Sequence, residues 1–306
     1  MEKSKDTLNN KAHGPDVLAV IPSIGGAGYD AVIELQDKLN SIEPISCLVI
    51  SNSRSLTAHL RSLDVSVATD GSNRGFGHSV SIGAATSETW DWLLIVNDDI
   101  NLEVDLFRAA IMGTLETQGV VNEIVYFDID RIRRIPQRLQ VFLQVSLLGK
   151  VLPVHEKHLH ADSNSYRSFS CVAISRRTFE LNAGFDPDLV FTYEDADFVS
   201  RAIRTGARQR CVTASGVTHS HSVSSGKYID AVLPVATYSA AKYLDKLGSP
   251  RLLNTLIILA ALALRILFVP ATRSPKSKHL KGILSSCIAV INRGRVQPQL
   301  PLYSEL

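Results

Sequence analysis

The sequence WLLIVNDD, residues 92–99, joins an apolar run to two adjacent carboxylates. Five successive apolar residues predict a strand buried on both faces at 92–96. The polar residues Asn97, Asp98 and Asp99 follow at its carboxyl end. Carboxylates in that position are either a hard-oxygen site for Mg²⁺ or Mn²⁺ held jointly with substrate phosphates, or an acidic turn that caps the next helix. Taken alone, the stretch favours the turn.

Similar apolar runs recur through the first part of the chain and alternate with helical segments. Further strands are predicted at 17–21, 46–50 and 65–68, and helices at 29–39, 57–63 and 75–86. This alternation is typical of an α/β fold with a mostly parallel sheet flanked by helices. Ligands of such sheets bind beyond the carboxyl ends of the strands. We therefore expect Ser23, Ser51 with Asn52, and residues 97–99 to converge.

The later part of the α/β region is less regular. Strands are predicted at 124–127, 168–174 and 210–213, and helices at 104–117, 177–181 and within 191–206. Residues 128–165 contain a basic cluster and an amphipathic stretch at 141–152; the cluster is Arg131, Arg133, Arg134 and Arg138. Such a cluster is either a binding surface for an anionic partner or a solvated face.

Composition sets limits on the function. The 306 residues are 45% hydrophobic and 20% charged, with a formal net charge of +2, so no overall field favours nucleic acid. The four cysteines are widely spaced, which excludes a CxxC zinc framework and a disulfide scaffold and indicates a reduced, cytoplasmic setting. Residues 1–16 are polar, lack the apolar core of a secretory signal and are expected to be a disordered lead-in.

The segment 252–269 stands apart because 15 of its 18 residues are apolar. As a helix it would be roughly 27 Å long, just short of a bilayer core. It either contacts a membrane, in the plane or across it with Arg265 reaching the interface, or is buried in the fold or in a dimer. Residues 271–306 contain six basic side chains and one acidic one, which suits the cytoplasmic face of a membrane. We expect residues 231–306 to be a helical extension that follows an α/β domain at 17–230.

A second carboxylate cluster lies at Tyr193-Glu194-Asp195-Ala196-Asp197. Three carboxylates in four positions repel one another, which a fold tolerates more readily when a cation or a catalytic role offsets the repulsion. One of them, near a metal-bound substrate, would act as general base. Asp197 and Arg201 have i,i+4 spacing, and for this pair a structural salt bridge is the favoured interpretation.

Histidines form the third candidate group. His219 follows a strand-like segment, and its imidazole would either complete a metal shell or contact a diphosphate, although a lone surface histidine is the default. His155, His158 and His160 have no such context and are left out of the site.

The order of these motifs resembles that of family-2 glycosyltransferases of the GT-A fold, in particular the bacterial rhamnosyltransferase-like and galactofuranosyltransferase-like members. The resemblance covers about residues 17–226. It depends on an ordered series of short motifs: Val20–Ser23, Asn73-Arg74-Gly75-Phe76-Gly77 with Gly83, Leu94–Asp99, Gly184-Phe185-Asp186, Phe191–Asp197 with Arg201 and Gly206, and Val217-Thr218-His219 with Ser224.

The resemblance implies roles for particular residues. Asp99 matches a metal-binding aspartate, with Asp98 beside it, and His219 matches a histidine that ligates the metal in similar enzymes. Asp195 matches the carboxylate proposed as general base, with Glu194 beside it. The nucleotide would be held by Pro22, Ser23, Ser51, Asn52, Asn73, Gly75, Asn97 and Asp98.

The implied reaction is an inverting transfer from a nucleotide-diphosphate sugar, such as a UDP- or dTDP-sugar, to a glycan or lipid-linked glycan, with Mn²⁺ or Mg²⁺ as cofactor. We expect a cytoplasmic protein, peripheral on the inner face of the cell membrane, as a monomer or a homo-oligomer. Ser51 and Asn97 stand where similar enzymes frequently have aspartates. Two alternatives stay open: a degenerate GT-A domain that acts as a binding or scaffold module, and a sugar-phosphate nucleotidyltransferase. The latter is disfavoured because residues 22–29 contain no Lys or Arg.

Overall fold

The computed structural model describes residues 15–115, 121–127, 132–150, 164–219, 228–272 and 275–305. Several sequence predictions therefore lie outside the described residues. These are nearly all of the lead-in at 1–16, His155, His158 and His160, Arg131, and Ser224.

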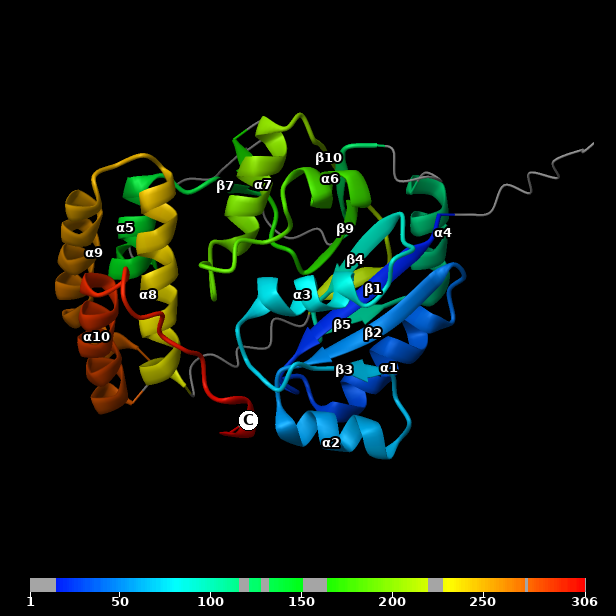
Figure 1. The fold of residues 1–306 in the computed structure, drawn as a ribbon, viewed down its shortest axis with the longest axis horizontal. Helices are drawn as coiled ribbons and strands as arrows, with labels where there is room; N and C mark the ends of the chain where they lie inside the picture. The colour runs from blue at the N-terminus through cyan, green and yellow to red at the C-terminus, as the bar shows by residue number, and fades with distance from the viewer. Residues whose placement is uncertain are drawn as a thin grey trace, which may run out of the picture.

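A seven-stranded sheet forms the centre of the α/β part (Figure 1), in the order β10-β6-β9-β4-β1-β2-β3. The strands are β1 Val17–Ser23, β2 Ile45–Ser51, β3 Val67–Ala68, β4 Trp92–Val96, β6 Glu123–Tyr126, β9 Cys171–Ser175 and β10 Arg208–Cys211. The pairs β1–β2, β1–β4, β2–β3 and β6–β10 are parallel, whereas β9 runs antiparallel to both β4 and β6. The mostly parallel sheet is confirmed. The reversal of β9 was not predicted, because a strand buried on both faces has the same apolar pattern in either direction.

Helices cover both faces of this sheet, which explains the unbroken apolar runs. Val17, Ala19 and Ile21 of β1 face one core, formed with α1 Tyr29–Asn40, α2 Arg54–Ser62 and α4 Val104–Thr114. Leu18 and Val20 face the opposite core, formed with α3 Phe76–Ala85, α6 Arg176–Leu181 and α7 Glu194–Arg204. Two small antiparallel pairs complete this part: β5 Ile100–Leu102 with β11 Val217–His219, and β7 Arg133–Arg134 with β8 Ser165–Tyr166.

A helical bundle lies beside the α/β part (Figure 1). It consists of α5 Arg138–Ser146, α8 Ile229–Lys246, α9 Arg251–Ile266 and α10 Lys276–Ile291, which pack against one another. Three of these helices, α8, α9 and α10, come from the C-terminal part of the chain. α5, which includes part of the predicted amphipathic stretch, joins them from the middle of the chain and buries Val141 and Val145.

The apolar segment expected at 252–269 forms α9 and a short 3₁₀ turn, Val269–Ala271. Its Asn254, Ile258 and Leu262 face the bundle, whereas Leu252 and Leu256 are more than half exposed. Arg265 does not reach outward toward an interface; it is buried and donates to the carbonyl of Val145 in α5 (2.8 Å). Among the described helices, none has both the length and the apolar character needed to cross a membrane.

After α10 the chain returns to the α/β part and ends near α2 and α3 (Figure 1). Leu300 is buried against Val190 and Val235. The Pro301 carbonyl accepts a hydrogen bond from Asn73 Nδ2 (3.2 Å), and a 3₁₀ turn at Tyr303–Glu305 follows. This C-terminal tail, residues 292–305, links the bundle to the edge of the sheet where the predicted nucleotide residues lie.

Candidate active site

The carboxyl ends of β1 and β4 meet, because the two strands are parallel neighbours. The Ser23 hydroxyl donates to Asp98 Oδ2 at 2.5 Å and accepts from the Gly25 N–H at 2.8 Å. Burial raises the pKa of the Asp98 carboxyl above its usual value, although the hydrogen bond from Ser23 acts in the opposite direction. The ends of β1 and β4 therefore converge as expected, through a direct hydrogen bond between Ser23 and Asp98.

A cavity of about 280 Å³ opens at this edge of the sheet. Nearly all of the predicted nucleotide residues line it, and so does the predicted metal ligand Asp99: Pro22, Ser23, Asn52, Asn73, Gly75, Asn97, Asp98 and Asp99. Sequence reasoning missed the opposite wall, which comes from Tyr228, Val232, Leu300 and Pro301. No local motif marks those four residues, since they reach the cavity only through the packing of α8 and the C-terminal tail. We call this the donor cavity.

Ser79 of α3 fixes two residues of the donor cavity, Asn52 and Gly75. Sequence reasoning did not identify Ser79. Asn52 Nδ2 donates to Ser79 Oγ (2.8 Å), and that hydroxyl donates to the Gly75 carbonyl (3.0 Å). Gly75 has φ 93°, and a Cβ there would lie 1.7 Å from the Val190 carbonyl oxygen. Only glycine fits this position, which explains the Gly in the Asn-Arg-Gly-Phe-Gly motif.

Ser51 lies apart from the donor cavity. Its side chain is fully buried; its hydroxyl donates to the Ser53 carbonyl (2.9 Å) and accepts from Thr57 Oγ1 (2.9 Å). These bonds fix the turn between β2 and α2, at whose start Asn52 enters the cavity. The hydroxyl of Ser51 thus stabilises the turn that carries Asn52.

Asp99 and His219 come together through the β5–β11 pair, although they are far apart in the sequence. His219 Nε2 lies 3.0 Å from Asp99 Oδ1, and both side chains are largely buried. This separation is that of a hydrogen bond between the two side chains. Two atoms bound side by side to an octahedral cation at about 2.1 Å are also about 3.0 Å apart, so the pair could provide two adjacent ligands once the shared proton is lost. Within the described part of the chain, no group of three His, Cys, Asp or Glu side chains could hold a metal. The remaining positions would have to come from substrate phosphates and water, as is usual for Mg²⁺ sites.

A second cavity, of about 400 Å³, adjoins the donor cavity and shares Phe191 with it. Glu194 and Asp195 line it from the start of α7, and Leu233 and Thr237 of α8 lie on the bundle side. The two predicted groups of carboxylates thus lie in neighbouring cavities. We call this one the acceptor-side cavity.

The backbone that leads into α7 is strained. Thr192 and Tyr193 both have positive φ, 70° and 67°, which is uncommon for any residue other than glycine and costly for a β-branched one. Strain of this kind costs on the order of 1–3 kcal/mol per residue and persists only where the surroundings enforce it. It points the first turn of α7 into the acceptor-side cavity.

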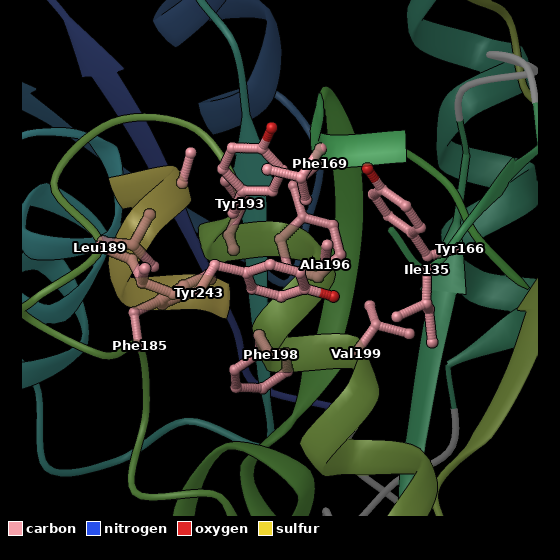
Figure 2. Close-up of a cluster of buried hydrophobic side chains, with 14 of the residues drawn as sticks. Ile135, Tyr166, Phe169, Phe185, Leu189, Tyr193, Ala196, Phe198, Val199 and Tyr243 are labelled. Carbon is pink, nitrogen blue, oxygen red and sulfur yellow. The ribbon is translucent and has the colours of Figure 1, made fainter. Parts of the chain in front are cut away.

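An aromatic cluster holds this strained backbone in place (Figure 2). The ring of Tyr193 stacks on Tyr243 of α8 with centroids 5.1 Å apart, and Phe198 stacks on Phe185 at 5.0 Å. Tyr193 also donates from its hydroxyl to Gln144 Oε1 of α5 (2.7 Å). The start of α7 is therefore held by both the sheet side and the bundle.

Glu194 and Asp195 are adjacent but have different surroundings. Glu194 Oε2 is buried and has no hydrogen-bond partner, whereas Asp195 Oδ1 accepts from the Ala196 N–H (2.7 Å). Burial, and secondarily the charge of Asp195, raises the pKa of Glu194 to about 8. The raised pKa favours the protonated form of Glu194, which leaves Asp195 as the candidate base.

Asp197 has a structural role, as the sequence favoured. It is buried, and its Oδ2 accepts from Arg201 Nε (2.8 Å) while Lys246 of α8 approaches Oδ1 at 2.6 Å. Arg201 also donates to the carbonyls of Asn182 and Gly184 and so anchors the turn before α7.

Two solved structures of similar architecture are those of glycosyltransferases. A mannosyltransferase from Pyrobaculum calidifontis, in complex with GDP-Man and Mn²⁺, superposes with a TM-score of 0.52 at 13% identity, over 92% of this chain and 87% of that one. The chain has the GT-A fold. GalNAc-T7 with UDP, GalNAc and Mn²⁺ superposes with a TM-score of 0.51 at 14% identity, over 78% of this chain but only 52% of GalNAc-T7. No protein-family model and no curated protein matches the sequence.

Proposed function

We propose that this GT-A protein is a glycosyltransferase that transfers a sugar from a nucleotide-diphosphate donor, with inversion at the anomeric carbon, to a glycan or lipid-linked glycan. The observation that carries the proposal is the pair of adjoining cavities that share Phe191. One is lined by Asp99, whose carboxylate contacts His219, and the other is lined by Glu194 and Asp195. The mannosyltransferase and GalNAc-T7, both solved with Mn²⁺ and a nucleotide or nucleotide sugar, support a donor of this class.

In this mechanism Pro22, Asn52 and Gly75 line the place of the nucleotide, and the diphosphate lies toward Asp98 and Asp99. A Mn²⁺ or Mg²⁺ ion on Asp99 and His219 would neutralise charge that develops on the leaving diphosphate. Asp195 accepts the proton of an acceptor hydroxyl as its oxygen bonds to the anomeric carbon and the bond from that carbon to the β-phosphate oxygen breaks. Because Glu194 is protonated, Asp195 has no second negative charge beside it.

Binding and turnover test the two halves of the site separately. We expect one of UDP, dTDP and GDP to bind by calorimetry in a Mn²⁺-dependent manner, and Asp99→Ala to weaken this binding by at least about tenfold, or ~1.4 kcal/mol. Asp195→Asn should keep donor binding and lower turnover by about 10²–10⁴-fold.

Other outcomes would redirect the assignment. An Asp195→Asn enzyme that turns over at a near wild-type rate would remove Asp195 as the base. Folded protein that binds none of the three nucleotides would favour a degenerate GT-A binding module. Ser51 and Asn97, which stand where similar enzymes frequently have aspartates, agree with that alternative. Formation of a nucleotide sugar from a sugar phosphate would identify a nucleotidyltransferase.

A further inference from the structure

A buried arginine lines the acceptor-side cavity. Arg265 of α9 is 9% exposed, and burial lowers its pKa to about 10, so it still carries its charge at neutral pH. Its Nε donates to His279 Nε2 (2.9 Å) and its Nη1 to the Val145 carbonyl (2.8 Å). Neither partner is an anion, and no carboxylate among the described residues pairs with Arg265.

A buried charge without a counter-ion is costly in a fold. The Val145 carbonyl lies in the last turn of α5, where the helix dipole offsets part of that cost. A guanidinium only donates, so His279 Nε2 must accept and is uncharged at that nitrogen. The two contacts orient Arg265 but do not neutralise it.

Other features of the cavity point to a ligand rich in acceptor oxygens. Arg133 of β7 lines the same cavity, which adds a second cation. Thr192 Oγ1 and Glu194 Oε2 are buried there without a hydrogen-bond partner. Both atoms could donate a hydrogen bond to an oxyanion, the carboxyl of Glu194 in its protonated form. Two cations and two unused donors in one cavity suit a phosphate better than a neutral sugar.

We propose that the acceptor-side cavity binds a phosphate group of the acceptor, held by Arg265 with Arg133. This inference rests on the proposed glycosyltransferase function, which it deepens by naming the acceptor class: a phosphate-bearing alcohol. The bound phosphate places the acceptor between the bundle and Asp195. The shared chemistry is the phosphate, whether it belongs to a lipid or to a small soluble molecule.

The competing explanation is that Arg265 only caps the end of α5. Loss of stability cannot separate the two, because either role predicts a less stable variant. Anion binding can separate the two roles, because phosphate affinity would not depend on Arg265 if this residue only capped the end of α5. The measurement therefore has to be binding to the folded, full-length protein.

The test uses inorganic phosphate and protein in EDTA, so that no metal in the donor cavity recruits the anion. We expect phosphate to bind by calorimetry and to raise the melting temperature. Arg265→Met, and separately Arg133→Met, should weaken phosphate binding by at least tenfold. The matched control is Arg251→Met on the same helix, since Arg251 is exposed and lies outside the cavity.

Glycerol phosphate and dodecyl phosphate then distinguish the two sources. Tighter binding of dodecyl phosphate supports a lipid phosphate, and equal binding supports a soluble one; both require Arg265. The proposal is overturned if wild-type protein does not bind phosphate, if folded Arg265→Met and Arg133→Met bind it equally well, or if acetate binds as tightly. Because no donor is present, these results do not depend on whether the nucleotide experiment succeeds.

Discussion

Glu194 and Asp195 show how two adjacent carboxyls acquire different chemistry from their surroundings. Only the Glu194 carboxyl has a buried, unpartnered oxygen, while Asp195 accepts a backbone N–H at the helix start, where the dipole favours negative charge. The sequence identified both residues as candidates but could not assign the proton. Burial and hydrogen bonding decide that, and both arise from the packing of α7 against the bundle.

The raised pKa of Glu194 predicts a pH dependence of stability. Between about pH 4.5 and pH 8 the folded state keeps a proton that the unfolded state has released, so the free energy of unfolding falls as pH rises through this window. At ~1.4 kcal/mol per pKa unit the loss amounts to a few kcal/mol. Glu194→Gln removes the titration, so its melting temperature should fall less than that of the wild type between pH 5 and pH 8.5, by about 4 °C or more.

Thermal unfolding of both proteins at the two pH values measures this difference. Glu88→Gln is the control, since Glu88 is exposed and its replacement should leave the wild-type pH dependence intact. Parallel pH curves for Glu194→Gln and wild type would mean that Glu194 is ionised in the folded protein.

The residues that sequence reasoning found share one property: they follow a strand or begin a helix. Asp98, Asp99 and Glu194 occupy such positions, and a local pattern is enough to locate them. Arg265 and Leu300 line the same two cavities but lie within an apolar helix and in the C-terminal tail. Their roles depend on how distant elements pack, which no single-sequence pattern encodes. For Arg265 the sequence left both a membrane interface and burial in the fold open, and the structure shows burial.

At the level of elements, α9 and α10 each bury one face in the bundle and leave another exposed. Leu252, Leu256 and Leu267 around α9 and Leu284 and Ile288 of α10 are all more than half exposed. Lys276 and Lys278 lie in the first turn of α10, at the positive end of the helix dipole, where basic residues are unfavourable. Exposed apolar side chains and basic residues on the same two helices suit an anionic membrane surface, and we expect both helices to lie in its plane.

Vesicle binding tests this surface. We expect the protein to co-sediment with vesicles that contain phosphatidylglycerol and much less with pure phosphatidylcholine. Leu256→Ser combined with Leu284→Ser should reduce binding by tenfold or more, because each buried leucine contributes about 1.5–3 kcal/mol. Leu63→Ser is the matched control: Leu63 is 52% exposed but follows α2, on the other part of the molecule.

A different outcome would assign the face to a second copy of the chain. In that case wild-type protein would form a concentration-dependent dimer by light scattering, the double variant would be a monomer, and neither would bind vesicles selectively. The membrane prediction would then be wrong.

At the level of the whole molecule, both cavities lie where the α/β part meets elements that come later in the chain. α8 contributes to both, through Val232 and Leu233, and the C-terminal tail closes the donor cavity with Leu300 and Pro301. The α/β alternation predicted the sheet and the strand ends. It could not predict that the last residues of the chain return to those strand ends, because the tail has no regular pattern of its own.

The tail therefore forms part of the donor site and can be tested by one side chain. Leu300 is 9% exposed and packs on Val190 and Val235, and the neighbouring Pro301 carbonyl fixes Asn73. Leu300→Ala removes this anchor, which should loosen the tail and weaken metal-dependent nucleotide binding about tenfold by calorimetry, with little change in melting temperature. Leu302→Ala, at a position that is 52% exposed, should behave like the wild type. Faster proteolysis within the tail of Leu300→Ala would show that it has detached. If a detached tail instead tightens nucleotide binding, the tail competes with the donor and does not form its wall.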